Sequence, residues 1–284
     1  MMDSYAPRHH MLRMRRETRR RLVRVSAIEQ LTPGMRRILF TSPDLHDFES
    51  LAPDDHVKLF VPNPVAAGGD GNACMRDYTP RAFDAAQGTL TIDFALHESF
   101  ALHESGASHE SGALHGAGAL HEAGPATAWA LAAKPGDEIE IGGPRGSVIV
   151  SDDFDWYLLI GDETALPAIG RWVESLRADV PVKTIAVVND NAERQAFTTK
   201  AAWDPVWVTR DGKQADDAGP LQAALAASGP LPQGDGFVWI AAEAHVARAL
   251  RTYVVEALGQ PKAWVKAAGY WVLGEADAHV RIDN

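Results

Sequence analysis

The sequence has a single cysteine, Cys74, and no apolar run that approaches the about 20 residues needed to cross a bilayer. One cysteine excludes an intramolecular disulfide and a thiolate cluster within one chain. No apolar segment followed by a small-residue cleavage site lies near the start, so no secretion signal is expected. These absences predict a protein of the reducing cytoplasm without an integral membrane segment.

Several catalytic patterns are missing as well. Ser147 and Ser151 have no evident histidine and acid partners, and no helical stretch carries His-Glu-x-x-His. No Gly-x-Gly-x-x-Gly fingerprint follows a strand-like segment. The sequence therefore predicts no catalytic side chain and no metal site.

Negative charge dominates, but it is unevenly distributed. The net charge is −11, yet residues 1–37 hold ten arginines against three acids, so they carry +7 and the remainder −18. A basic start can bind nucleic acid, but an acidic body would repel phosphate backbones. We expect no nucleic-acid partner, and a basic flexible N-terminus over residues 1–19. A transit peptide stays open as an alternative.

The first half of the chain reads as short strands separated by turn residues. Six such strands favour a small six-stranded antiparallel β-barrel. The expected strands are Leu22–Val25, Arg37–Phe40, Val57–Val61, Met75–Arg81, Thr89–Leu96 and Glu138–Ile141.

From Trp156 onward strands alternate with helices, which indicates an open, parallel, Rossmann-like α/β sheet. The change near Ser151 predicts two domains, residues 20–150 and 151–284. The expected strands are Trp156–Ile160, Val182–Val188, Pro205–Val208, Gly236–Ala241 and one starting at Ala263–Val265, with helices at Leu166–Ala178, Leu221–Ala227 and Ala244–Leu258.

Residues 95–124 consist of five tandem hexapeptides, each with one histidine: His97, His103, His109, His115 and His121. A metal-binding tract is one hypothesis. Six residues advance about 600° around a helix, so the histidines would not share a helical face. We therefore expect a mobile surface loop over about residues 97–123, whose role the sequence does not indicate.

The run Arg76–Ala82 combines two arginines with a tyrosine and a threonine. On one strand, Arg76 and Tyr78 would share a face, and Thr79 and Arg81 the other. An aromatic ring, a hydroxyl and forked guanidinium donors suit a large flat ligand that carries phosphates. An exposed edge strand with ordinary charges is the alternative.

Two helix starts could hold phosphates. Gly124-Pro125-Ala126-Thr127 precedes a short helix, whose free N–H groups favour an anion. The segment Gly161–Ile169 follows the first strand of the second half, at the strand end where α/β sheets bind nucleotides. Ordinary capped helices are the plain alternatives.

Arg76-x-Tyr78-Thr79-x-Arg81 resembles the flavin-binding signature of the siderophore-interacting proteins, which are relatives of the ferredoxin reductases. Residues 161–168 match that family's Gly-Asp-Glu-Thr-Ala-Leu-Pro-Ala segment, and residues 269–274 match its Gly-Tyr-Trp-x-x-Gly string. The chain has Ala241-Ala242-Glu243 where the family usually has Ala-Gly-Glu, which puts close nucleotide approach there in question. The resemblance covers about residues 20–275.

This resemblance implies an FAD-binding barrel domain followed by an NAD(P)H-binding domain. The cofactor-binding residues it implies are Arg76, Tyr78, Thr79, Arg81, Asp93, Phe94, Leu96, Gly124, Pro125, Ala126, Thr127, Gly161, Asp162, Glu163, Thr164, Ala165, Glu243, Tyr270 and Trp271. A basic trio for an anionic iron chelate is implied at Lys58, Arg145 and Lys266, beside the alternative that each is simply solvated.

The function that follows is an FAD-dependent ferric-siderophore reductase that uses NADPH or NADH. A siderophore-binding protein without reductase activity, and a general NAD(P)H flavin or ferredoxin-type reductase, are the alternatives. Arg194 or Lys200 could hold the extra phosphate of NADPH, although Asp190 nearby argues against it. Some relatives take electrons from a ferredoxin, so the donor stays open, and we expect a monomer.

Overall fold

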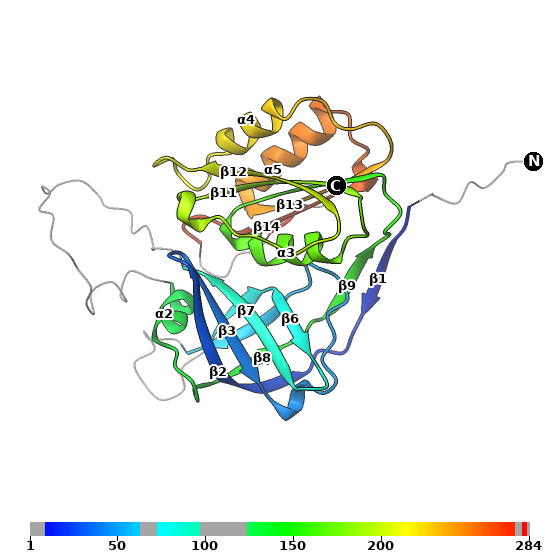
Figure 1. Ribbon diagram of the computed structural model, residues 1–284. Helices are drawn as coiled ribbons and strands as arrows, with labels where there is room; N and C mark the ends of the chain where they lie inside the picture. The colour runs from blue at the N-terminus through cyan, green and yellow to red at the C-terminus, as the bar shows by residue number, and fades with distance from the viewer. Residues whose placement is uncertain (1–8, 63–72, 97–123, 276–279, 283–284) are drawn as a thin grey trace, which may run out of the picture.

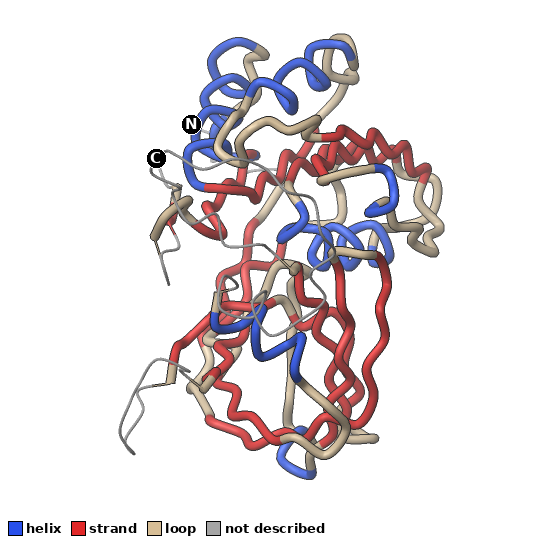
Figure 2. The backbone as a smooth tube through the Cα atoms, turned by 90° about the vertical axis from the view of Figure 1, so that its left-hand side faces the viewer, coloured by secondary structure: helices blue, strands red, loops and turns tan. Residues whose placement is uncertain are grey.

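The computed structural model describes residues 9–62, 73–96, 124–275 and 280–282, which form two lobes (Figure 1). One lobe is a curled antiparallel sheet, and the other is a parallel sheet covered by helices on both faces (Figures 1 and 2). Among the described residues, no helix has the length and apolarity that a membrane crossing requires.

The curled lobe is a seven-stranded sheet in the order β5-β4-β8-β2-β3-β7-β6. Its strands alternate buried and exposed side chains, because successive residues point to opposite faces of a sheet. The buried faces enclose a core that includes Phe40, Phe48 and Phe94, and helix α2 (Pro125–Ala132) packs Ala126 and Ala130 against it. The strands are β2 (Arg20–Thr32), β3 (Met35–Thr41), β4 (Val57–Val61), β5 (Cys74–Tyr78), β6 (Pro80–Asp84), β7 (Thr89–Ala95) and β8 (Glu138–Gly142), with a 3₁₀ turn at Pro43–Leu45.

The six-stranded barrel is corrected to this open, curled, seven-stranded sheet, and the extra strand comes from the motif itself. The sequence predicts one strand over Met75–Arg81. In the structure this segment forms two strands, because β5 ends at Tyr78 and β6 begins at Pro80 after Thr79. β5 pairs with β4, whereas β6 pairs with β7 at the opposite edge of the sheet. Pro80 has no N–H to donate, so a ladder cannot continue through it. Arg81 therefore belongs to a different strand from Tyr78.

A separate two-stranded ladder joins β1 (Met11–Arg15) to β9 (Gly146–Val150) beside the two lobes (Figure 1). Neither strand is predicted by the sequence analysis. The expectation of a flexible N-terminus is wrong for Met11–Arg15, while residues 1–8 lie outside the described part of the chain. The hexapeptide loop, residues 97–123, lies outside it too.

The second lobe confirms the predicted parallel α/β sheet, in the order β12-β11-β10-β13-β14-β15. β10 is buried along its whole length, as expected for a central parallel strand. Helix α3 covers one face and helices α4 and α5 cover the other (Figure 1). The strands are β10 (Trp156–Gly161), β11 (Pro181–Val188), β12 (Ala202–Thr209), β13 (Gly236–Glu243), β14 (Val265–Trp271) and the antiparallel β15 (Val280–Arg281). The helices are α3 (Leu166–Ser175), α4 (Gly219–Ala227) and α5 (Ala244–Thr252), which continues as a π turn over Tyr253–Ala257. Short 3₁₀ turns lie at Glu163–Ala165, Asn191–Glu193 and Lys262–Trp264.

Polar contacts fix the two lobes against each other. On helix α3, Arg171 donates to the Ser50 hydroxyl at 2.9 Å and to the Ser50 carbonyl at 2.9 Å. The Arg81 guanidinium donates to both Glu174 oxygens, at 2.7 and 2.6 Å. These contacts position the face of the curled sheet against the parallel sheet, and a cleft opens between them.

Candidate functional site

The candidate site is a cleft of about 2170 Å³ lined by residues of both lobes. Its volume exceeds the roughly 300–1,000 Å³ of an ordinary small-molecule pocket, so it has room for a dinucleotide and a second ligand. The predicted residues that line it are Lys58, Arg76, Tyr78, Thr79, Asp93, Leu96, Gly124, Pro125, Ala126, Thr127, Arg145, Glu163, Thr164, Lys266, Tyr270 and Trp271. Those that do not line it are Arg81, Phe94, Gly161, Asp162, Ala165 and Glu243.

Aromatic side chains reach the cleft from both lobes. The Tyr78 ring lies 4.5 Å from the ring of Phe94, which is itself fully buried behind it. From the other lobe, Tyr270 packs perpendicular to Trp239, with ring centroids 6.1 Å apart. Burial raises the pKa of Tyr78 and of Tyr270, so both phenols stay protonated and uncharged across the physiological range. The arrangement suits a flat aromatic ligand between the lobes.

Helix α2 offers an anion site at its first turn. Gly124 precedes the helix without a side-chain cap, and a Cβ placed on it would meet nothing within 4 Å. The first intrahelical bond runs from the Ala128 N–H to the Gly124 carbonyl at 2.9 Å. The N–H groups of Ala126 and Thr127 therefore have no intrahelical acceptor, and both residues line the cleft. Such a turn favours a phosphate.

Arg81 and Asp93 take part in contacts within the protein. Asp93 is 1% exposed and accepts both donors of the Arg37 fork, at 2.7 and 2.8 Å. Arg81 is committed to Glu174 and lies 3.8 Å from Asp93. Arg81 thus joins the curled sheet to helix α3, and its position does not support a direct phosphate contact.

Asp162 and Glu243 are structural carboxylates at the carboxyl ends of β10 and β13. Asp162 accepts hydrogen bonds from the N–H of Thr164 and of Glu243 and from the indole of Trp271, each at 2.9 Å. Glu243 is fully buried and accepts from the N–H groups of His245 and Val246. Both acids hold the backbone that shapes this end of the cleft.

The N–H and hydroxyl of Thr164, which the sequence predicts as phosphate donors, already donate hydrogen bonds within the protein. Its hydroxyl donates to Asp162 at 2.5 Å, as does its N–H. Glu163 forms an ion pair with Arg210, and despite the opposing effect of burial this pair raises the pKa of Arg210. Arg210 lines the cleft, and sequence reasoning missed it. Its signal was available, because it follows the predicted strand Pro205–Val208 at the ligand-binding ends of the sheet.

Ala242, which stands where the family usually has glycine, is fully buried in the core beneath α5. It does not line the cleft. Its extra methyl group therefore does not narrow the nucleotide approach.

The three predicted substrate cations all line the cleft, but their surroundings differ. Lys58 forms an ion pair with Asp77 at 3.0 Å, and Lys266 forms one with Asp54 at 2.6 Å. Arg145 is exposed on the turn before β9. Within the part of the chain that the structure describes, no group of three or more His, Cys, Asp or Glu side chains could hold a metal ion.

Comparisons with known proteins agree with this architecture. The family model described as "Siderophore-interacting FAD-binding domain" matches residues 24–69 and 65–148, and the one described as "Siderophore-interacting protein" matches residues 154–274. An NADPH-dependent ferric-chelate reductase of Escherichia coli K12 is 30% identical over 276 residues, covering 91% of this chain and 95% of the relative.

Among solved structures, a siderophore utilization protein from T. fusca has a TM-score of 0.79 at 29% identity, covering 95% of this chain and 98% of that one. The ferredoxin-NADP⁺ reductase from Plasmodium falciparum has a TM-score of 0.60 at 10% identity, covering 86% and 94%, and so shares the ferredoxin-reductase-like fold. The chain belongs to the siderophore-interacting protein family.

Proposed function

We propose that this protein is an FAD-dependent reductase that passes electrons from NADPH to ferric siderophores. The observation that carries the proposal is the single cleft in which Tyr78 and the first turn of α2 meet Tyr270 and Trp271 of the other lobe. A cofactor that mediates between a nucleotide and an iron chelate must lie within reach of both, and only a site between the lobes allows that.

The residues present fit FAD. Tyr78 offers a ring face, Thr79 a hydroxyl, and the amides of Ala126 and Thr127 a seat for the diphosphate, with Arg76 lining the same cleft. FAD, when bound, accepts two electrons as a hydride and can release them singly. The protein's part is to hold the ligands, keep Tyr78 and Tyr270 neutral, and exclude water between the lobes.

The overall reaction balances with no further reactant. One NADPH gives up a hydride, whose two electrons reduce two ferric ions to ferrous ions, and one proton is released. Ferrous iron binds hard oxygen ligands more weakly than ferric iron, so reduction frees the metal. Of the three predicted substrate cations, Arg145 would receive the chelate, because the peripheral oxygens of the chelate are commonly anionic, whereas Lys58 and Lys266 are paired with carboxylates.

The part of the cleft at the carboxyl end of the parallel sheet, where the nucleotide would bind, favours NADPH over NADH. Lys213 lines it just after the carboxyl end of β12, and its cation suits an additional phosphate, whereas Arg210 beside it is paired with Glu163. Arg194 and Lys200 are exposed and do not line the cleft. We further propose residues 20–150 as the FAD-binding domain and 151–284 as the nucleotide-binding domain of a monomeric cytoplasmic protein.

The test is an anaerobic titration of the FAD-loaded protein. NADPH should bleach the flavin absorption band, and a ferric siderophore should restore it with two ferrous ions trapped per NADPH consumed. A protein that binds the chelate tightly but leaves the reduced band unchanged would instead be a siderophore-binding protein without reductase activity.

A further inference from the structure

The N-terminal strand β1 forms one wall of the cleft. It pairs antiparallel with β9, with Arg13 opposite Val148 and Arg15 opposite Gly146 (Figure 1). This segment precedes residue 24, where the family match begins, so nothing in the family comparison assigns it a role.

Two arginines of this strand face the cleft. Side chains alternate along a strand, so Met11, Arg13 and Arg15 share one face. All three line the cleft, and so does Met14 from the other face of the strand. The ladder also places the backbone of Arg145 next to that of Arg16, because the Arg16 N–H donates to the Arg145 carbonyl at 2.8 Å. Arg13, Arg15 and Arg145 therefore come from the β1–β9 ladder and the turn before it, and all three line the cleft.

These three arginines differ from the cations of the cleft that are paired with carboxylates. Lys58 and Lys266 each form an ion pair with a carboxylate, and so do Arg16 with Glu49 and Arg20 with Glu140. In the described part of the chain, no carboxylate forms an ion pair with Arg13, Arg15 or Arg145. A paired lysine presents little net charge to an approaching anion, whereas an unpaired guanidinium presents its full charge and forked donors.

The strand is held at both ends. Before it, the His9 ring is 1% exposed and lies between Asp153, at 2.7 Å, and Asp235, at 3.0 Å. It also stacks on Phe154 with ring centroids 4.0 Å apart. This buried clamp fixes the beginning of the arginine-bearing strand.

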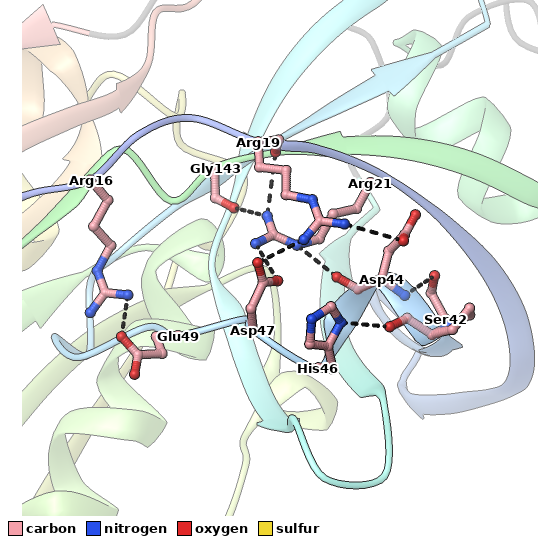
Figure 3. A network of polar contacts seen from close by, with 10 residues as sticks. Arg16, Arg19, Arg21, Ser42, Asp44, His46, Asp47, Glu49 and Gly143 are labelled. Atoms are coloured by element: carbon pink, nitrogen blue, oxygen red, sulfur yellow. Dashed lines mark hydrogen bonds and ion pairs between the residues drawn. The ribbon is translucent and has the colours of Figure 1, made fainter.

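After the strand, a polar network fixes its exit (Figure 3). Arg16 pairs with Glu49, and Arg19 donates to Asp47 at 2.7 Å. Arg21 also bonds Asp47, and hydrogen bonds from Arg21 and Arg19 lower the pKa of Asp47 to about 2, so it stays charged. Arg16, Arg19 and Arg21 are therefore bound to carboxylates of the protein itself. Arg13 and Arg15 have no such ion pair among the described residues, so their guanidinium groups can bind a ligand.

We propose that β1 is a substrate-binding element in which Arg13 and Arg15, together with Arg145, form a cationic wall that selects anionic ferric chelates. This inference rests on the proposed function. The ligand class is an iron complex with peripheral carboxylate or phenolate oxygens, which guanidinium groups bind by forked hydrogen bonds.

The test uses the FAD-loaded variant R13Q/R15Q with two chelates, anionic ferric EDTA and the neutral ferric tris-maltolate complex. The KM for ferric EDTA should rise about 3- to 10-fold at low salt, and the rise should shrink as ionic strength increases. The KM for the neutral chelate should change much less, and the KM for NADPH and the affinity for FAD should not change.

The matched control is R24Q/R194Q, which removes the same charge from exposed arginines that do not line the cleft. If both double variants give the same KM for ferric EDTA, the proposal is wrong. A comparable loss of FAD or NADPH affinity in R13Q/R15Q would also overturn it, because the arginines would then bind a cofactor.

A binding measurement separates this proposal from the proposed function. Gallium EDTA is a redox-inert anionic probe, and its dissociation constant can be measured by calorimetry even if no electron transfer occurs. Weaker binding by R13Q/R15Q than by R24Q/R194Q would support the cationic wall regardless of catalysis, and equal binding would contradict it.

Discussion

The Tyr78–Thr79 segment of the curled lobe and the carboxylates Asp162 and Glu243 of the parallel lobe differ in where their side chains lie. In the curled lobe, Tyr78, Thr79 and Thr127 line the cleft. In the parallel lobe, Asp162 and Glu243 are bonded to their own backbone and do not line the cleft. We infer that equally recognisable motif residues can differ in role, some lining the cleft where a ligand would lie and others bonded to the protein's own backbone.

The largest expected effect is a loss of stability when Asp162 of the parallel lobe is replaced. Asp162→Ala removes the acceptor of the buried Glu243 N–H and of the partly buried Thr164 N–H and Trp271 indole, so the free energy of unfolding should fall by at least about 3 kcal/mol. Urea unfolding monitored by tryptophan fluorescence measures it. Asp190→Asn, which alters an exposed turn cap at Ala192, is the control and should cost less than about 1 kcal/mol. Similar losses in both variants would refute a structural role specific to Asp162.

The next largest expected effect is weaker FAD binding when Tyr78 of the curled lobe is replaced. Tyr78→Ala removes the aromatic face, so the FAD dissociation constant should rise roughly 10- to 100-fold. Tyr78→Phe keeps the ring and should stay close to the wild type. Quenching of flavin fluorescence on binding measures both constants. Equal FAD affinity in Tyr78→Ala and the wild type would show that the ring does not contact the cofactor.

A smaller effect separates paired cations from unpaired ones. Lys58→Gln removes the positive charge that offsets Asp77 and makes the cleft more negative, so the KM for ferric EDTA should rise about 3-fold. The double variant K58Q/D77N removes both charges and should return the KM toward the wild-type value. A double variant as impaired as Lys58→Gln alone would mean that Lys58 itself binds the chelate, as the sequence first suggested.

The smallest effect concerns the clamp on β1. Burial alone lowers the pKa of His9, but hydrogen bonds and charge attraction from Asp153 and Asp235 outweigh it and raise the pKa above 6.5. The stabilisation is therefore complete below about pH 6.5 and is lost as the pH rises through the raised folded-state pKa. The melting temperature of His9→Gln should lie below that of the wild type at pH 6, and the gap should close toward pH 9. A gap that does not change with pH would exclude a protonated clamp.

Much of the parallel lobe could be predicted because its signals are local. A run of apolar residues predicts the strand Val182–Val188, and helical spacing of apolar residues predicts the helix Leu221–Ala227. The structure has a strand and a helix at these positions. The split at Thr79 was harder, since it depends on which strands the two sides pair with. The lone signal was Pro80 within an otherwise strand-like run.

The candidate site is likewise hard to predict where a side chain's partner lies far away in the sequence. Asp162 follows a strand at the ligand-binding end of the sheet, so sequence alone cannot tell whether its carboxylate meets a ligand or the backbone. The sequence analysis places Arg13 and Arg15 in a flexible terminus, although their period-two spacing in Met-Leu-Arg-Met-Arg is that of a strand face. The partner strand β9, which fixes them, lies more than a hundred residues away in the sequence.

The measurement that tests the division between the lobes most directly is amide hydrogen exchange with and without FAD. We predict that FAD slows exchange in peptides covering residues 76–79 and 125–128, and leaves residues 161–165 unchanged. Protection at 161–165 without protection at 76–79 would contradict the account, because it would place the flavin against the motif that we assign to structure.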